Sequence, residues 1–295
     1  MEVVLLAISS PLMVALIIGE MLYSHYHHKE LYQVKDTAVS LLCTSLNFIN
    51  DLVFRTISLS ILHWFYLHGL DLFAAKGILY WLCLFLAQDL AYYLLHCADH
   101  FCRFFWASHV THHSSKKFNL AVAIRSSVFQ PYYRFFYFIP LALAGFEALD
   151  IVFMYAATQV YGFWVHTETI GKLPNWFEFL FVTPSHHRVH HASNVEYLDA
   201  NMGMVLIIWD RIFGTFKPEL EGVCPQFGLT KNIESFNPIK VVFHEWKAIL
   251  RDVKKSKSLH IKFRYIFGPP GWSHDASSLT SKEIRLKYQD RNPSY

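Results

Sequence analysis

The sequence predicts an all-α integral membrane protein, a bundle of about four to five transmembrane helices with a helical cytoplasmic cap. Three observations predict this class. Of 295 residues, 53% are hydrophobic and only 17% are charged, below the quarter that is usual for soluble domains. Several apolar stretches are long enough to cross a membrane. Histidines gather in tight clusters between and after these stretches, so the cap is expected to carry a histidine-rich site for two metal ions.

Five apolar stretches are the expected membrane helices. Residues 3–23 are almost wholly apolar, and at ~1.5 Å per residue they can cross a ~30 Å hydrocarbon core. A cleaved signal peptide is the rival interpretation, but the stretch lacks a basic beginning, which favours a retained helix. The second and third stretches are residues 38–67 and 70–95. Residues 132–146 and 151–165 form a predicted hairpin, which either spans the membrane or re-enters it.

The distribution of charge predicts the orientation. Seventeen of the 26 lysines and arginines follow His166, and only Lys76 falls in a loop on the opposite side. Cytoplasmic loops are rich in lysine and arginine, so we expect the N-terminus outside and every histidine cluster in the cytoplasm. The formal charge of +3 is too small to indicate a nucleic-acid partner. The five cysteines form no CxxC motif, which argues against a thiolate zinc site and a disulfide framework.

Three segments follow from these patterns. We expect N-terminal transmembrane helices in residues 1–79, a histidine-box domain in residues 80–216, and a cytoplasmic tail in residues 217–295. The tail contains a basic amphipathic helix at residues 238–257. Such a helix either packs on the cap or contacts anionic lipid headgroups, and the pattern does not separate the two.

Histidine spacing carries the chemical prediction. The clusters read HxxxH at residues 96–100, HxxHH at 109–113 and HHxxHH at 186–191. Spacings of three and four residues place side chains on one helix face, and imidazole is the commonest protein ligand for transition metals. In HxxHH the first two histidines are expected to share a face, with the third turned by about 100°. One box can then supply two metal ions.

Ten histidines are predicted metal ligands, more than the three or four that one zinc ion takes. The number therefore indicates two ions, although imidazole alone does not select the metal. Asp89 lies on the same helix stripe as the first box and either orients an imidazole or makes a hydrogen bond within the bundle. The predicted ligands are His96, His100, His109, His112, His113, His166, His186, His187, His190 and His191.

Longer strings around these boxes resemble a known family. They include His112-His113-Ser114-Ser115, His166-Thr167-Glu168, residues 183–191, residues 209–216 and residues 268–272. Together they resemble the fatty acid hydroxylase/sterol desaturase superfamily of membrane diiron enzymes. Within it the chain is most similar to the alkylglycerol monooxygenase and bacterial sterol-desaturase-like branch. The resemblance covers about residues 80 to 272.

The resemblance implies a cytoplasmic site of two iron ions that uses O₂ to hydroxylate or desaturate a C–H bond of a fatty acyl, ether-lipid or sterol substrate. It assigns eight of the ten histidines listed above as ligands, and His166 and His186 are the two additions to that set. Glu168 matches a characteristic glutamate of the branch, so we expect a catalytic role for it. A pterin is the implied reductant within that branch, whereas the sequence itself identifies neither the electron donor nor the oligomeric state.

Two other functions remain open from the sequence. A zinc-dependent membrane hydrolase would use Glu168 as its base, but the chain has no HExxH motif. A non-catalytic metal-binding or haem-binding membrane protein needs fewer histidines, since haem takes one or two axial ligands. For Glu168 itself the alternative is a surface carboxylate at the end of a helix.

Overall fold

The structure, a computed structural model, describes residues 1–73 and 75–291. It is helical throughout, and within the described residues only two isolated β-bridges occur. Three helices are long and apolar enough to cross a membrane: α1 (Glu2–Tyr26), α2 (Val34–Leu67) and α3 (Ile78–Phe101). The all-helical class is confirmed. A count of four to five crossings stays a prediction, because α7 (Ala148–Trp164) and the short helices between residues 130 and 143 are shorter than these three.

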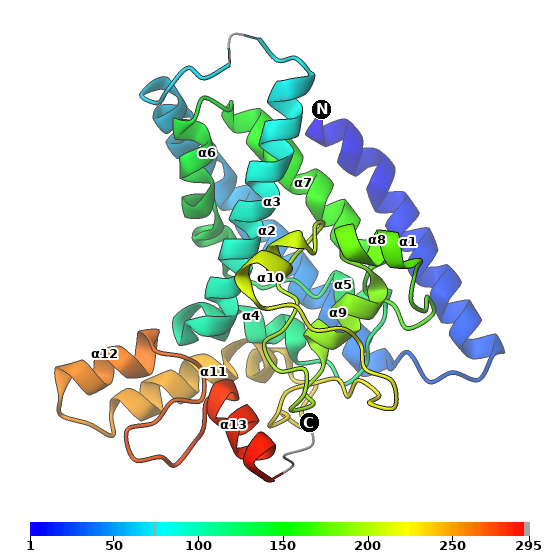
Figure 1. The fold of residues 1–295 in the computed structure, drawn as a ribbon, viewed down its shortest axis with the longest axis vertical. Coiled ribbons are helices and arrows are strands. Elements are labelled where there is room, and N and C mark those ends of the chain that lie inside the picture. The colour runs from blue at the N-terminus through cyan, green and yellow to red at the C-terminus, as the bar shows by residue number, and fades with distance from the viewer. Residues whose placement is uncertain (74, 292–295) are drawn as a thin grey trace.

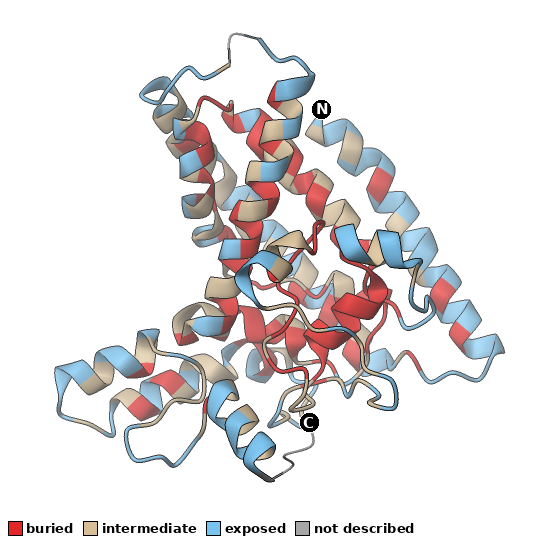
Figure 2. Ribbon diagram, viewed as in Figure 1, coloured by how far each residue is buried: buried red, intermediate tan, exposed pale blue. Residues whose placement is uncertain are grey.

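Helix α1 has the polarity of a lipid-facing segment. It lies along one side of the bundle (Figure 1), and Figure 2 shows it mostly exposed. Its exposed side chains are largely apolar, including Val3 and Ile8, whereas its three buried residues, Ser9, Glu20 and Ser24, are polar. In lipid a polar side chain must face protein to find a hydrogen-bond partner, so this inverted pattern indicates which face of α1 meets the bundle.

Helix α3 begins later than the sequence predicted and, as expected, carries the first histidine box at its end. It starts at Ile78 rather than at residue 70 and continues to Phe101, so its last two turns carry the first histidine box. Leu70 instead lies in a loop beside the hairpin tip, where its N–H donates to the carbonyl of Leu143 at 2.6 Å. A Cβ on Gly69 would lie 2.5 Å from the same carbonyl oxygen, so a glycine at this position allows the close contact.

The predicted hairpin exists, but its first arm is irregular. It consists of η1 (Gln130–Tyr132), η2 (Arg134–Phe138) and α6 (Ile139–Leu143), and prolines stand at the start of η1 and α6. Proline lacks the N–H that a continuous helix needs, which accounts for an arm of short pieces. Helix α7 forms the second arm and returns from the tip to the histidines. Lys76 pairs with Glu147 and Asp150 at the tip, both at 2.7 Å.

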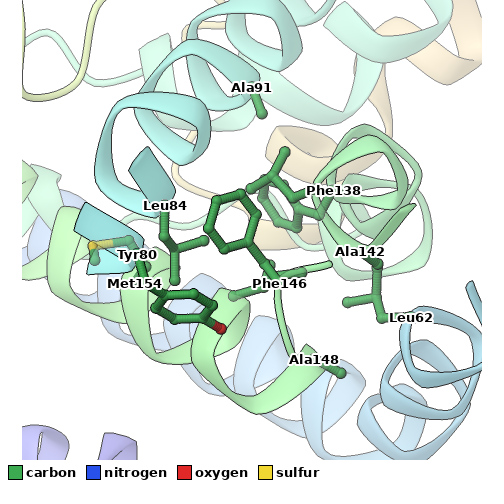
Figure 3. Close-up of a cluster of buried hydrophobic side chains, with 11 residues drawn as sticks. Leu62, Tyr80, Leu84, Ala91, Phe138, Ala142, Phe146, Ala148 and Met154 are labelled. Carbon is green, nitrogen blue, oxygen red and sulfur yellow. The ribbon is translucent and has the colours of Figure 1, made fainter. Parts of the chain in front are cut away.

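A hydrophobic core joins α2, α3, α6 and α7 (Figure 3). Leu62, Leu84 and Phe146 are among its buried side chains, and the hydroxyl of Tyr80 donates to Asp150 at 2.8 Å. Between membrane helices such clusters stabilise the bundle through close packing and interhelical hydrogen bonds. The core therefore fixes the two helices, α3 and α7, that lead directly to histidines.

The remaining helices belong to the part of the chain expected to form the cap, and among them α11, α12 and α13 lie at the lower end of the molecule in Figure 1. Of these, α11 corresponds to the predicted amphipathic helix and ends four residues earlier. It packs on α4, where Arg103 donates to Glu245 at 2.6 Å and to Asp252 at 2.8 Å. Packing on neighbouring helices is the first of the two roles predicted for this helix. The second role, contact with anionic lipid headgroups, stays a prediction. The cap helices are α4 (Arg103–His113), α5 (Leu120–Ala123), α8 (Asn175–Leu180), α9 (Pro184–His191), α10 (Ile208–Phe213), α11 (Pro238–Val253), α12 (Leu259–Phe267) and α13 (Ser281–Arg291).

Candidate metal centre

Four parts of the chain converge on one buried region. These are the end of α3, helix α4, the residues Val165 and His166 after α7, and helix α9. Every residue of α9 is buried (Figure 2). Helix α9 begins at a proline in its first position, and the hydroxyl of Thr183 accepts from the N–H of His186 at 3.5 Å. Proline and a threonine cap favour a helix start at this point, which sets the direction in which the third box projects.

The structure brings nine of the ten predicted histidines into two groups. The first group consists of His96, His100, His109, His113 and His190, and the second of His112, His166, His187 and His191. Within each group the ring nitrogens that could bind an ion all lie within 4.8 Å of one another. Imidazole nitrogens bind zinc at about 2.0–2.1 Å, and similar distances on one ion place opposite ligands about 4 Å apart. Each group therefore has the dimensions of a metal site.

Two helices divide their histidines between the groups. Helix α4 contributes His109 and His113 to the first group and His112 to the second. Helix α9 contributes His190 to the first group and His187 and His191 to the second. One box thus supplies both groups, as expected, but the expected division was wrong. Residues four apart differ by about 40° around a helix and residues three apart by about 60°. The four-residue pairs consequently stay together.

Hydrogen bonds orient several of the rings. The Nδ1 atoms that bond to backbone carbonyls belong to His166 (Gly162, 2.7 Å), His96 (Met202, 2.8 Å), His190 (Ala200, 3.0 Å) and His112 (Arg125, 3.2 Å). A carbonyl oxygen only accepts, so Nδ1 carries the hydrogen in each ring and Nε2 keeps its lone pair. This is the usual arrangement of metal-bound histidine, whose other nitrogen donates to a carbonyl or carboxylate.

The free nitrogens of the two groups converge, and several of them have no hydrogen-bond donor of their own. The Nε2 atoms of His112 and His166 lie 3.3 Å apart, although both are acceptors by the tautomers just assigned. The buried Nε2 atoms of His100, His190 and His191 have no hydrogen-bond partner among the described residues. Buried acceptors without donors are costly, and a cation between them removes that cost. The residues present therefore fit two metal ions with nitrogen ligands.

Burial keeps the rings neutral. It lowers the pKa of His166 to about 4, and burial, helped by the neighbouring histidines, lowers the pKa of His109 well below its usual range. The same direction and leading cause apply to the pKa of His112, His113, His187, His190 and His191. Removing a charged group from water disfavours its charged form. Near neutral pH the unprotonated ring is thus the stable form, which is the form that binds metals.

His186 lies outside both groups. Its Nε2 is 3.5 Å from a carboxylate oxygen of Glu178, and its ring packs against Phe216 with centroids 5.6 Å apart. Its carbonyl oxygen accepts from Asn201 at 3.0 Å. The side chain of His186 therefore points from α9 toward Glu178 and Phe216, away from the two groups. Its predicted role as a ligand gains no support from this geometry.

Glu168 is exposed beside the second group. Within the described residues its carboxylate forms no hydrogen bond or ion pair, so it does not hold an imidazole N–H. Partial burial raises its pKa, against the lowering effect of Arg188 and Lys117. The predicted catalytic role of Glu168 consequently depends on contact with a ligand rather than with a histidine.

Two buried aspartates hold the segment around Met202, and one of them, Asp210, orients the first group indirectly. Asp89 accepts from the N–H groups of Val205 and Leu206 at 3.1 and 3.0 Å, and Asp210 accepts from the N–H of Met202 at 2.6 Å. The carbonyl of Met202 in turn receives the Nδ1–H of His96. Of the two roles predicted for Asp89, the structure shows hydrogen bonds within the bundle and no contact with an imidazole.

Sequence reasoning missed two further supports of the centre. Arg125 is buried, donates to Asp36 at 2.8 Å and to the carbonyl of Thr111 at 2.9 Å, and offers its own carbonyl to His112. Glu20 accepts from the N–H of Leu120 at 2.8 Å. A carboxylate inside an apolar stretch is a known signal of function, so Glu20 was detectable, whereas nothing in the sequence pairs residues 36 and 125.

Two cavities reach the histidines. The first, of about 370 Å³, touches five of them and is bounded by α1, α2, the hairpin and α7. Its wall includes Leu6, Phe48, Leu62 and Phe163, with a charged group of Glu2, Asp51, Arg55 and Arg134 in the same lining. The second cavity, of about 610 Å³, lies in the cap and touches His100, His113, His190 and His191.

Comparison with known proteins agrees with the resemblance inferred above. The family model described as fatty acid hydroxylase matches residues 81–215. The alkylglycerol monooxygenase of Homo sapiens is 41% identical over 216 residues, which cover 69% of this chain and 47% of that protein. The alkylglycerol monooxygenase of Danio rerio is 35% identical over 246 residues, or 82% of this chain and 53% of that protein.

A bacterial relative is more distant. Ornithine lipid hydroxylase OlsE of Rhizobium tropici is 28% identical over 95 residues, which cover 32% of this chain and 28% of that protein. The chain spans about half the length of the alkylglycerol monooxygenases from Homo sapiens and Danio rerio. No solved structure matches it.

Proposed function

Because residues 81–215 form a fatty acid hydroxylase domain, we propose that the chain is a membrane-bound oxygenase that uses O₂ and two iron ions to hydroxylate a lipid C–H bond. The observation that carries this proposal is the pair of histidine groups next to a cavity bounded by membrane helices. Redox-active metal with open positions can activate O₂. Redox-silent zinc would fit the same nitrogens, but the relatives named as monooxygenase and hydroxylase favour iron.

The chain's own residues would hold and shield the metals. His96, His100, His109, His113 and His190 would bind one ion, and His112, His166, His187 and His191 the other. The carbonyls that receive the Nδ1–H groups fix the rings before any ion binds, which reduces the reorganisation needed at the site. Burial of all these rings but one, which is partly buried, limits the access of water.

The first cavity would receive the lipid chain. Its apolar wall suits an alkyl group, and it reaches His96 and His109 of the first group and His112, His166 and His187 of the second. A carbon held there lies beside both metal positions, and holding a reactant in place is itself a large part of catalysis. The two relatives named alkylglycerol monooxygenase favour an ether lipid among the fatty acyl, ether-lipid and sterol substrates.

The orientation, the reductant and the domain limits belong to the same proposal. The excess of lysine and arginine after His166 supports a cytoplasmic site. A reduced pterin is the proposed electron donor, because the relatives are alkylglycerol monooxygenases. Residues 1–79 would anchor the chain in the membrane, residues 80–216 would carry the chemistry, and residues 217–295 would complete the cap.

Isotope labelling tests the function. Membranes containing the protein would be incubated with an alkylglycerol, tetrahydropterin and ¹⁸O₂, and products weighed by mass spectrometry. We expect about two irons per chain, as two histidine groups require, and one ¹⁸O atom in the lipid product. Zinc in the purified protein, together with ¹⁸O in the product of a parallel incubation in H₂¹⁸O under ordinary O₂, would indicate the hydrolase instead. Loss of two hydrogens without gain of oxygen would indicate desaturation.

A further inference from the structure

Helix α11 turns one apolar face to the protein and leaves a second apolar stripe uncovered. Its buried apolar side chains are Val241, Val242 and Ile249. At about 100° per residue, Ile239, Phe243 and Leu250 fall on a separate side of the helix. These three residues are between 40% and 64% exposed. A helix that only packs on the rest of a cap needs one apolar face, so the second stripe requires its own explanation.

Helix α12 exposes a similar stripe. Leu259, Phe263 and Phe267 follow one another at intervals of four residues, so they lie along one side of the helix. They are between 44% and 80% exposed, whereas Tyr265 on the opposite side is buried. Figure 1 shows α12 to one side of the helical bundle rather than beneath it. Two helices of the cap thus present apolar stripes that no described part of the chain covers.

Both stripes adjoin the ends of the membrane helices. The N–H of Arg103, just after α3, donates to the carbonyl of Gly268, just after α12, at 2.9 Å. Phe101, the last residue of α3, is itself exposed. On the other helix, the ring of Phe243 contacts that of Phe129, with centroids 5.7 Å apart, and Phe129 leads into the hairpin. A lipid layer around these ends would also reach α11 and α12.

Lysines accompany the stripes. Lys240 and Lys247 are exposed on the side of α11 opposite its buried face, next to the apolar stripe. Neither forms an ion pair within the described residues. The two carboxylates of α11, on Glu245 and Asp252, both turn inward to Arg103. The outward charge of α11 is therefore positive.

We propose that α11 and α12 form a docking surface for an anionic lipid bilayer, the same bilayer that holds α1, α2 and α3. The apolar stripes would lie in the headgroup layer, and the lysines would bind the anionic groups of the lipids. Apolar residues on one side and basic residues beside them are typical of helices that lie in the plane of a membrane surface. The inference goes beyond the proposed function and does not depend on the reaction.

The charges favour lipid over a second copy of this chain. A symmetric dimer uses the same patch on both subunits. Pairing α11 with α11 would bring Lys240 and Lys247 of one copy close to the same lysines of the other, and like charges that face each other weaken an interface. Anionic headgroups instead complement these lysines.

Photo-crosslinking identifies what covers the stripes. The residue p-benzoylphenylalanine would replace Phe263 on α12 and, in a second variant, Leu250 on α11. The full chain would be reconstituted into vesicles with equal amounts of phosphatidylcholine and phosphatidylserine. The matched control carries the same residue at Leu286 on α13, which is 50% exposed and lies farther from the membrane helices in Figure 1. Val4 on α1, which is 62% exposed, is the position that should label lipid in any case.

After illumination we expect lipid adducts at Phe263 and Leu250, detected by mass spectrometry of the peptides, and none at Leu286. The yield should fall in vesicles of phosphatidylcholine alone. It should also fall when Lys240→Gln and Lys247→Gln are combined, because each lysine near an anionic surface contributes a factor of about five in affinity. The matched pair on α13, Lys282→Gln with Lys287→Gln, should leave the yield unchanged.

Several outcomes would overturn the proposal. Crosslinked pairs of chains in place of lipid adducts would show that a second copy covers the stripes. Adducts at Val4 but at neither stripe position would show that the two helices stay clear of the bilayer, and equal yields at the stripes and at Leu286 would show unspecific contact. A yield that ignores both lipid charge and the lysines would contradict the preference for anionic lipid. None of these measurements uses O₂ or a substrate, so the proposed oxygenase stands or falls separately.

Discussion

Glu20 accepts a hydrogen bond from the hydroxyl of Thr167, the residue that follows His166. The same carboxylate accepts from the N–H of Leu120 at 2.8 Å and from the hydroxyl of Tyr32. A helix whose other side largely faces lipid is thereby tied to the second histidine group. Three donors from three segments meet on one side chain, so α1 supports the second histidine group.

Glu20→Gln is expected to weaken the second group. Its amide nitrogen is a donor and would face at least one of the three donors, which leaves a buried group unpaired at a cost of about 1–3 kcal/mol. We expect iron content to fall below two per chain and activity to fall with it. Iron analysis of the purified variant measures this, with Glu30→Gln at an exposed position as the control. Parent-like iron content would contradict a supporting role for Glu20.

His112→Ala and His186→Ala should differ sharply. His112 belongs to the second group, whereas His186 stands outside both. Loss of partners that merely orient a ligand costs about 10–100-fold, so losing a ligand itself should reduce activity by at least ~100-fold and reduce bound iron. His186→Ala should keep its iron. Equal loss of iron in the two variants would restore His186 to the ligand set.

Glu168→Gln is expected to retain iron and to lose at least ~10-fold of its turnover, the lower range for lost polar partners at a metal site. The carboxylate is exposed two residues after His166 and contacts no histidine, so its proposed partner is a lipid headgroup or the reductant. Turnover would be measured at saturating lipid and tetrahydropterin, with Glu221→Gln as an exposed control. Parent-like turnover would leave Glu168 a surface residue.

Asp36→Ala is expected to destabilise the fold. It leaves the buried guanidinium of Arg125 without its carboxylate partner, and breaking a buried pair in this way costs about 3–5 kcal/mol. The carbonyl of Arg125 also orients His112, so iron content should fall as well. Thermal unfolding in detergent compares this variant with Lys35→Ala at the exposed neighbouring position. Equal Tm values would show that the ion pair contributes little.

The sequence predicted the centre better than the connections around it. Histidine spacing is local, and a helix converts it directly into shared faces, so the boxes on α4 and α9 were recognisable. Leu70 lies in a loop beside the hairpin tip, where its N–H donates to the carbonyl of Leu143, and hydropathy does not distinguish such a loop from a helix. The side chain of His186 points away from both groups because of the way α9 is rotated against its neighbours. The spacing of residues within α9 does not predict this rotation.

Helices α4 and α9 each contribute histidines to both groups, while α3 serves only the first and His166 only the second. Any rotation of α4 or α9 that improves one group therefore moves the other. An ion bound by the first group would hold α4 and α9 in the orientation that the second ion needs, so the two ions should load cooperatively. Titration of the metal-free protein with iron should then yield mostly empty and fully loaded molecules, with few that hold a single ion.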